Sequence, residues 1–169
     1  LVLNNTKVFP ARLFGRGEKG ERIEILLVKE RAPQVWEVLA KPGRKLEKNK
    51  VISFNHGQFE AVVLEDAAEA LGATKLLKFN SSRPLVELLN QYGQTPLPPY
   101  IKRPYPEADE DSDRRGYQTV YARYPGSCAC PTAGLHFTDE LLDALRKKSV
   151  GLIEITLHIG PGTFRPIKE

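Results

Sequence analysis

The stretch Arg22-Ile23-Glu24-Ile25-Leu26-Leu27-Val28-Lys29-Glu30 decides how the first half of this chain folds. Every second residue from Ile23 to Leu27 is apolar. An alternation with a period of two predicts a β-strand that buries one face. Residues 15–20 ahead of it are rich in glycine and charge, which is typical of a hairpin connection to a partner strand over residues 11–14.

Four more short strands are predicted downstream, at residues 35–40, 51–54, 59–64 and 74–79. The turn Asn55-His56-Gly57-Gln58 joins two of them as a hairpin, since Asn and Gly accept the backbone angles of tight turns. Six short strands separated by Gly, Pro and Asn favour a small antiparallel barrel or sandwich.

The pattern changes from strands to helices near Ser81. Ser82 is predicted to cap a helix that has Pro84 in its first turn and ends at Gly93. A proline-rich stretch follows, and then an acidic stretch over residues 107–113, which we interpret as an exposed loop.

The last third of the chain alternates strand, helix and strand. Residues 118–122 predict a strand, and Thr138 is predicted to cap a helix that Gly151 ends. That helix has acidic residues in its first turn and basic ones in its last, as the helix dipole favours. Residues 152–159 are mostly apolar and predict a central strand.

The expected fold is an α/β domain with an inserted small antiparallel β-barrel-like domain. The inserted domain would span residues 11–80, and the α/β domain would comprise residues 1–10 and 81–169. The chain begins with Leu, contains no Met and stops without a closing element, so we expect a fragment of a longer protein.

Composition narrows the class of protein only partly. Hydrophobic residues make up 41% of the chain, which suits a buried core, and the net charge is +4, which permits contact with nucleic acid without demanding it. No apolar run is long enough for a membrane span, and no signal peptide opens the chain. Cys128 and Cys130 lie too close for a disulfide framework, so we expect a reducing, cytoplasmic setting.

Two glycine-rich stretches in the last third each carry a histidine. In the first, His136 follows Gly134 and precedes the predicted helix start at Thr138, where backbone N–H groups attract anions. His136 is therefore a candidate acid, base or anion contact. The alternative, a histidine that caps or packs against a loop, stays open.

In the second stretch, His158 ends a predicted strand and is followed by Gly160 and Gly162. Binding loops follow the carboxyl ends of strands in α/β folds, and glycine allows close approach to a ligand. Thr163 and Arg165 add a hydroxyl and a fixed charge. A strand-end turn with a structural histidine is the alternative.

Weaker candidates lie elsewhere. Asn5 and Lys7 follow an apolar strand and either bind a polar ligand or form an Asx-type turn. Tyr100 either stacks on a base or packs under a loop. Cys128 and Cys130 lack the second pair that a zinc site needs, and we interpret them as small buried residues.

Taken together, five segments resemble the S-adenosylmethionine:tRNA ribosyltransferase-isomerase family of the queuosine pathway, in the family's order and over essentially the whole chain. They are Leu3-Asn4-Asn5-Thr6-Lys7-Val8 with Pro10-Ala11-Arg12, Leu97-Pro98-Pro99-Tyr100-Ile101, Tyr117-Gln118-Thr119-Val120-Tyr121-Ala122, residues 131–138 and residues 157–166. The chain departs from the family's pattern at Cys128, Cys130 and Pro161.

The resemblance implies an enzyme that moves the ribosyl part of S-adenosylmethionine onto 7-aminomethyl-7-deazaguanine in tRNA. The product would be epoxyqueuosine, with release of adenine and methionine. S-adenosylmethionine would be a co-substrate, and the resemblance implies no metal and no resident cofactor. The partners would be this nucleoside and the tRNA, with a monomer favoured.

The resemblance also implies roles for single residues. His136 and His158 would handle protons, which suits imidazole near neutral pH. Substrate would be held by Asn5, Lys7, Tyr100, Gly134, Thr138, Gly160, Gly162, Thr163 and Arg165. Phosphates of the tRNA would meet Lys7, Arg12, Lys102, Arg103, Arg114 and Arg115.

Two other functions compete with this one. The chain is alternatively a non-catalytic RNA-binding module built on the β-barrel. A different nucleoside or sugar transferase on the same scaffold is the second alternative.

Overall fold

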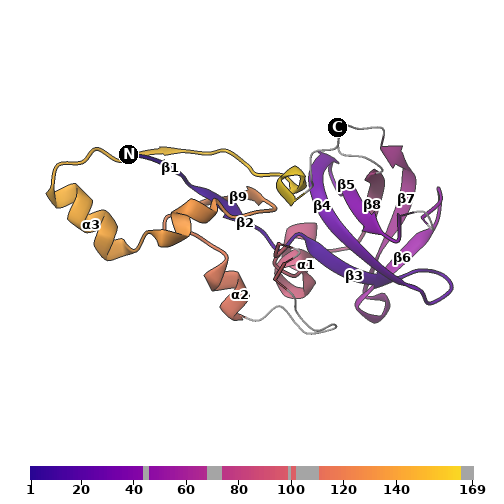
Figure 1. Cartoon of the computed structure of the whole chain (residues 1–169). Coiled ribbons are helices and arrows are strands. Elements are labelled where there is room, and N and C mark those ends of the chain that lie inside the picture. Colours follow the sequence, from indigo (N-terminus) through magenta and orange to yellow (C-terminus); the bar gives the residue numbers. More distant parts are fainter. Residues whose placement is uncertain (44–45, 68–73, 99, 102–110, 165–169) are drawn as a thin grey trace. The chain divides into compact units, whose positions relative to one another are not determined.

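The structure is a computed structural model that describes residues 1–43, 46–67, 74–98, 100–101 and 111–164. The chain forms two compact units (Figure 1). One unit is Pro10–Gln94, and the other combines Leu1–Phe9 with Thr95–Glu169. No helix in the described part of the chain is long and apolar enough to cross a membrane.

The first unit is a closed barrel of six antiparallel strands, seen in purple in Figure 1. Around the barrel, β3 is followed by β4, β5, β8, β7 and β6, and β6 pairs again with β3. The six predicted strands are confirmed, and the barrel is favoured over a sandwich. Their bounds are β3 (Arg12–Arg16), β4 (Arg22–Ala32), β5 (Val35–Lys41), β6 (Val51–Phe54), β7 (Phe59–Ala67) and β8 (Thr74–Asn80).

The alternation in β4 produces the barrel core. Ile23, Ile25 and Leu27 are all fully buried, as a period-two pattern requires when one face points inward. Gly15 lies where β3 meets β6, and a Cβ there would come within 2.6 Å of Ile52 Cγ2. Phe54 stacks on a second phenylalanine of the core, with ring centroids 5.0 Å apart. The core therefore combines aliphatic strand residues with an aromatic layer.

Helix α1 (Leu85–Tyr92) belongs to the barrel unit, which extends to Gln94, although we expected the inserted domain to end at residue 80. Its buried residues are the leucines of the predicted apolar face, Leu85, Leu88 and Leu89. The predicted cap at Ser82 is wrong. The N-cap position is Pro84, which has no side-chain acceptor, and the Ser81 hydroxyl instead accepts a hydrogen bond from Arg83 N–H at 3.0 Å.

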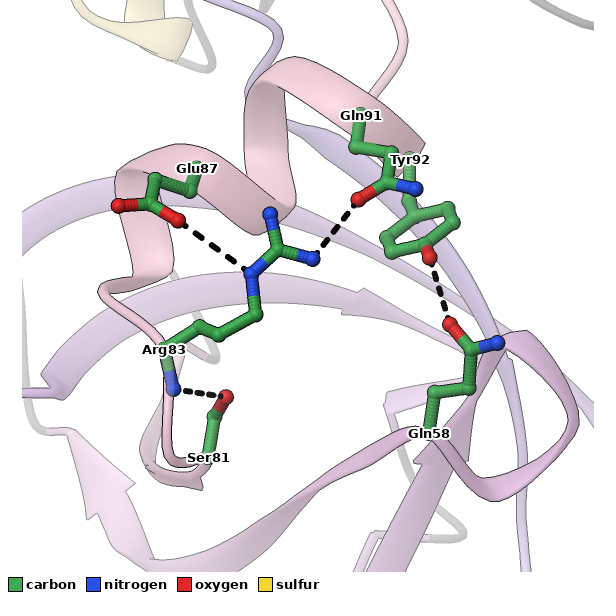
Figure 2. Close-up of polar contacts among 6 residues, drawn as sticks. All are labelled: Gln58, Ser81, Arg83, Glu87, Gln91 and Tyr92. Atoms are coloured by element: carbon green, nitrogen blue, oxygen red, sulfur yellow. Dashed lines mark hydrogen bonds and ion pairs between the residues drawn. The ribbon is translucent and has the colours of Figure 1, made fainter.

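Polar contacts connect α1 along its length and to the barrel (Figure 2). The Arg83 guanidinium donates to Glu87 at 3.3 Å and to Gln91 at 2.9 Å. The Tyr92 hydroxyl donates to Gln58 Oε1 at 2.5 Å, and Gln58 directly follows the short turn η2 (Asn55–Gly57) between β6 and β7. The predicted hairpin turn thus also anchors the end of α1.

The second unit contains two short parallel strand pairs. Strand β1 (Val2–Asn4) pairs with β10 (Ile153–Ile155), and β2 (Thr6–Val8) pairs with β9 (Tyr124–Ser127). The helical elements are α2 (Asp111–Gly116), the 3-10 turns η3 (Thr132–His136) and η4 (Pro161–Phe164), and α3 (Asp139–Lys147). The cap of α3 is Thr138, as predicted, because its hydroxyl accepts from Leu141 N–H at 3.2 Å.

In this unit one predicted strand is wrong and another is confirmed only in part, because amide side chains replace backbone pairing. Residues 118–122 form turns, and the Gln118 amide binds both polar groups of the Val8 backbone, at 3.0 and 3.1 Å. Of residues 152–159, only Ile153–Ile155 form a strand, and their side chains are exposed instead of central. Beyond it, the Asn4 amide binds the N–H and the C=O of Leu157, both at 3.0 Å.

The described end of the acidic stretch also differs from the prediction. Residues 107–110 lie outside the described residues, but 111–113 begin α2 and are not a loop. The Asp113 side chain is buried, and its backbone carbonyl accepts from Tyr117 N–H at 2.9 Å. Acidic residues suit the first turn of a helix because the helix dipole is positive there.

Candidate functional site

The clearest polar arrangement in the second unit surrounds His158. Its Nδ1 lies 2.8 Å from the Thr6 hydroxyl, which in turn lies 2.6 Å from the Ser127 hydroxyl. Ser127 Oγ also accepts a hydrogen bond from Ile159 N–H at 2.8 Å. Thr6 and Ser127 are fully buried, whereas His158 is exposed. The imidazole is therefore held at one nitrogen by a buried hydroxyl pair, although the residue as a whole is exposed.

Strands β2 and β9 are parallel neighbours whose register pairs Ser127 with Val8, two residues after Thr6. Thr6 begins β2 and Ser127 ends β9, and both lie on neighbouring strands of one small sheet. The segment after β10 then joins β9, because Cys128 N–H donates to the Ile159 carbonyl at 2.8 Å. His158 reaches the hydroxyl pair from this added segment.

Gly126 brings the backbone against the His158 ring. A Cβ at this position would lie 2.6 Å from His158 Cε1 and 2.7 Å from Nδ1, closer than real side chains approach. The φ angle of Gly126 is +153°, which also disfavours other residues. This glycine fixes one face of the imidazole at the backbone.

Asn5 is buried directly before Thr6, and its amide is used within the protein. The amide nitrogen donates to Glu154 Oε2 at 2.9 Å, and the amide oxygen accepts from the Thr156 hydroxyl at 2.7 Å. Glu154 also forms an ion pair with Arg123 at 3.2 Å. The predicted ligand-binding Asn5 therefore holds the segment that leads from β10 to His158.

His136 lies in different surroundings. It is exposed at the end of η3, and no hydrogen bond between described residues joins it to His158. Gly134 of the same turn is buried, because a Cβ there would lie 2.2 Å from the Tyr121 hydroxyl. The Tyr121 ring meets Phe137 edge-on with centroids 6.2 Å apart. Gly134 thus lets η3 pack on Tyr121, and burial raises the pKa of that phenol.

Thr119 adds a polar atom beside this packing. Its side chain is buried, and the hydroxyl has no hydrogen-bond partner within the part of the chain that the structure describes. Its Cγ2 would lie 2.7 Å from a Cβ on Gly134. The hydroxyl of Thr119 and the phenol of Tyr121 therefore both flank the turn that carries His136.

Thr138 uses its hydroxyl to start α3. It accepts from Leu141 N–H at 3.2 Å, and it hydrogen-bonds to the Glu140 carboxylate. The pKa of Glu140 is lowered by a hydrogen bond from its own backbone N–H and then by the Thr138 hydroxyl. Both hydrogen-bonding capacities of this predicted ligand residue are thus engaged at the helix terminus.

The second glycine stretch contains a short turn, η4. Gly160 is exposed, with open space where a Cβ would stand, and its carbonyl accepts from Thr163 N–H at 3.4 Å. Gly162 and Thr163 are exposed as well. Arg165 lies outside the described residues.

The structure describes some of the predicted RNA-contacting residues. Lys7 and Arg115 are exposed, Arg114 is half-buried, and Tyr100 is 77% exposed and free to stack. Arg12 lies in the barrel, where it forms an ion pair with Glu24 at 3.2 Å. Lys102 and Arg103 lie outside the described residues.

Cys128 and Cys130 are buried thiols that form no disulfide, as the sequence suggested. Burial raises the pKa of Cys128 to about 12 and that of Cys130 to about 11. Both therefore stay protonated at neutral pH and are poor nucleophiles. Among the described residues, no group of three His, Cys, Asp or Glu side chains is placed to hold a metal ion.

Sequence reasoning found His158 but missed Gly126, Ser127 and Thr6 as the groups that hold it. Strands of three or four residues give too short a pattern to reveal which of them pair. The available signal was Gly126-Ser127 directly after an aromatic residue and a proline, since small residues allow close approach at a strand end.

Comparison with known proteins places these features in one family. The queuosine biosynthesis protein family matches residues 1–169. An S-adenosylmethionine:tRNA ribosyltransferase-isomerase of Caldanaerobacter subterraneus subsp. tengcongensis is 46% identical over 170 residues, covering 100% of this chain and 47% of the relative. A protein of the same name from a Thermoanaerobacter species is 47% identical, with the same coverage.

The chain spans about half the length of these curated relatives. A solved structure, an S-adenosylmethionine tRNA ribosyltransferase from Thermotoga maritima, is 30% identical, with a TM-score of 0.41. That match covers 94% of this chain and 40% of the solved chain.

Proposed function

This chain belongs to the queuosine biosynthesis protein family, and we propose that the whole protein is an S-adenosylmethionine:tRNA ribosyltransferase-isomerase. It would transfer the ribosyl part of S-adenosylmethionine to 7-aminomethyl-7-deazaguanine in tRNA and rearrange it to give epoxyqueuosine. Two relatives named S-adenosylmethionine:tRNA ribosyltransferase-isomerase, at 46% and 47% identity, support the proposal. A non-catalytic RNA-binding barrel is not favoured by these matches.

The reaction sets three tasks for side chains. A base must remove a C5′ proton, which the adjacent sulfonium makes acidic, and imidazole is suited to this near pH 7. The target amine and the sugar must be held together, which is a matter of positioning. Negative charge that builds on the departing adenine must be met by a hydrogen-bond or proton donor.

One observation carries the assignment of these tasks to this chain: the exposed imidazole of His158 is fixed at Nδ1 by Thr6 at 2.8 Å. A ring held at one nitrogen and open at the other is oriented for a ligand, which resembles the support given to catalytic histidines by a second group. We assign His136 and His158 to the handling of protons. His136 is exposed on its turn and free of the restraints that hold His158.

Binding of the two substrates is distributed more widely in this proposal. The nucleoside and the base would be surrounded by Asn5, Tyr100, Gly134, Thr138, Gly160, Gly162, Thr163 and Arg165. Lys7 and Arg115, which are exposed, and Arg114, which is half-buried, would meet tRNA phosphates. S-adenosylmethionine would serve as co-substrate without a resident cofactor, in a cytoplasmic monomer.

The proposal includes a domain arrangement. The barrel unit, Pro10–Gln94, would be an inserted domain, because the remaining unit takes residues from both sides of it in the sequence. The two parallel strand pairs and α3 would then be parts of an α/β catalytic domain.

The test is kinetic and uses the full-length protein. We expect His136→Asn and His158→Asn each to lower turnover by about two to four orders of magnitude, as loss of an acid or base does. His56→Asn is the matched control, because His56 lies in the η2 turn with a φ of 57°, which Asn tolerates. Turnover close to wild type in either folded site variant would remove that residue from the mechanism.

A further inference from the structure

We propose that Ser127 and Thr6 form a one-way chain of hydrogen-bond donors that fixes neutral His158 as the tautomer protonated on Nε2. His158 would then present an Nε2–H donor to the substrate, and it would not be the base. The identity of that substrate rests on the proposed function. The tautomer itself rests only on the contacts of the described residues.

The hydroxyl proton of Ser127 sets the direction of the chain. Its hydroxyl oxygen accepts from Ile159 N–H at 2.8 Å, so that contact leaves the hydroxyl proton unused. The side chain is fully buried, and a buried hydroxyl proton needs an acceptor. Among the described residues, the acceptor within hydrogen-bond distance is Thr6 Oγ1 at 2.6 Å. Ser127 therefore donates to Thr6.

The same assignment of donor and acceptor fixes the direction of the hydrogen bond between Thr6 and His158. Its oxygen receives the Ser127 proton, so its own proton points to its other side-chain partner, His158 Nδ1 at 2.8 Å. Thr6 is also fully buried and cannot turn its hydroxyl to solvent. The reverse direction would have Nδ1–H donate to Thr6 and Thr6 donate to Ser127, which would leave the buried Ser127 proton without an acceptor.

An imidazole that accepts at Nδ1 carries its single proton on Nε2 when neutral. Gly126 keeps the backbone against the ring, so the orientation that this hydrogen bond selects is also held sterically. The Nε2–H group suits an electron-rich acceptor atom of the nucleoside, above all the adenine on which negative charge builds as it departs. Proton abstraction from C5′ would then fall to His136 or to another group.

The test reads the tautomer directly, by NMR of the full-length protein labelled with nitrogen-15 in histidine, without substrate and at a pH where His158 is neutral. The His158→Asn variant identifies the His158 signals. We expect a protonated Nε2 and an unprotonated Nδ1 that accepts a hydrogen bond. A protonated Nδ1 in the wild-type protein would overturn the proposal whatever the variants do.

Two variants of Thr6 distinguish the effect of the donor chain from the tautomer preference of a free imidazole. Thr6→Ser keeps the hydroxyl, so the Nδ1 signal should stay at its wild-type position. Thr6→Val keeps the shape and removes the donor, so the Nδ1 signal should move to that of a free lone pair. An unchanged signal in Thr6→Val would show that no donor acts on Nδ1 and would contradict the proposal.

Ser127→Ala removes the group that sets the direction of the chain. We expect a second population of His158 with the proton on Nδ1, since Thr6 can then turn either way. The signals of His56 and His136 should not move, which reports that the fold is intact. A single, unchanged tautomer in this variant would overturn the directional argument. Because these spectra need no substrate, a correct tautomer in an inactive protein would instead contradict the proposed function alone.

Discussion

Gly126 and His158 show how one glycine sets the position of a functional side chain. The ring atoms of His158 occupy the space that a Cβ on Gly126 would need, at distances from 2.6 to 2.8 Å. A side chain at position 126 would clash with the ring. Relieving that clash would move the imidazole, which is hydrogen-bonded at Nδ1. The position of the His158 ring therefore depends on residue 126 being glycine.

We accordingly predict that Gly126→Ala in the full-length protein lowers turnover on the order of a hundredfold, because a displaced catalytic group loses its alignment. Gly151→Ala is the matched control, since nothing lies within 4 Å of the Cβ position there. Turnover and the thermal unfolding midpoint should be measured for both. Equal turnover of the two variants would show that His158 tolerates displacement.

The two thiols give a second prediction at this scale, based on pKa values of about 12 for Cys128 and about 11 for Cys130. Only the thiolate reacts with iodoacetamide, so at pH 8 the folded protein should react slower than an unfolded control by about two orders of magnitude or more. The rate should rise as the pH is raised toward 11, because the thiolate fraction grows. Rapid labelling of the folded protein at pH 8 would contradict the burial of these side chains.

The sequence singles out candidate residues but does not show what each one contacts. His158 was predicted to end a strand that precedes glycines, whereas β10 ends at Ile155 and His158 lies exposed in the segment after it. The internal contacts of Asn5 with Glu154 and Thr156 were not foreseeable, because they join positions about 150 residues apart. A side chain's partner across such a separation depends on strand pairing, which local patterns do not contain.

At the scale of elements, prediction succeeded for the barrel strands and was less accurate for the strands of the other unit. The barrel strands were all found, because β4 and its neighbours carry enough alternation to define a buried face. In the other unit, β10 is shorter than the strand predicted over residues 152–159, and β9 begins after the strand predicted over residues 118–122 would have ended. Their pairing is extended by amide side chains, such as that of Asn4 on Leu157, which hydrophobic periodicity does not reveal.

Helix α3 provides a test of whether Thr138 is a cap alone. Thr138→Ala should cost about 1 kcal/mol of stability, because the Leu141 N–H loses its acceptor, and Thr138→Ser should cost much less. Chemical denaturation measures both. If Thr138→Ser keeps stability but loses substrate affinity, the residue also binds ligand. An undiminished stability of Thr138→Ala would contradict its role as the cap.

At the scale of the whole molecule, the account requires contact with tRNA phosphates. The exposed cations Lys7 and Arg115 and the half-buried Arg114 are the described candidates. If three phosphates are neutralised, a fourfold rise in salt concentration should weaken tRNA binding by about twentyfold. The measurement is a salt titration of tRNA affinity with the full-length protein. A tRNA affinity that does not change with ionic strength would rule out such contacts.

The central claim is that this chain carries the ribosyl-transfer site of a tRNA-modifying enzyme. Release of adenine from S-adenosylmethionine tests it most directly, measured with full-length protein and either tRNA bearing the aminomethyl-deazaguanine precursor or tRNA with unmodified guanine. The account predicts adenine release with the precursor tRNA, none with unmodified tRNA, and a loss of release in His158→Asn. Tight binding of the precursor tRNA without adenine release would contradict it and would indicate an RNA-binding module.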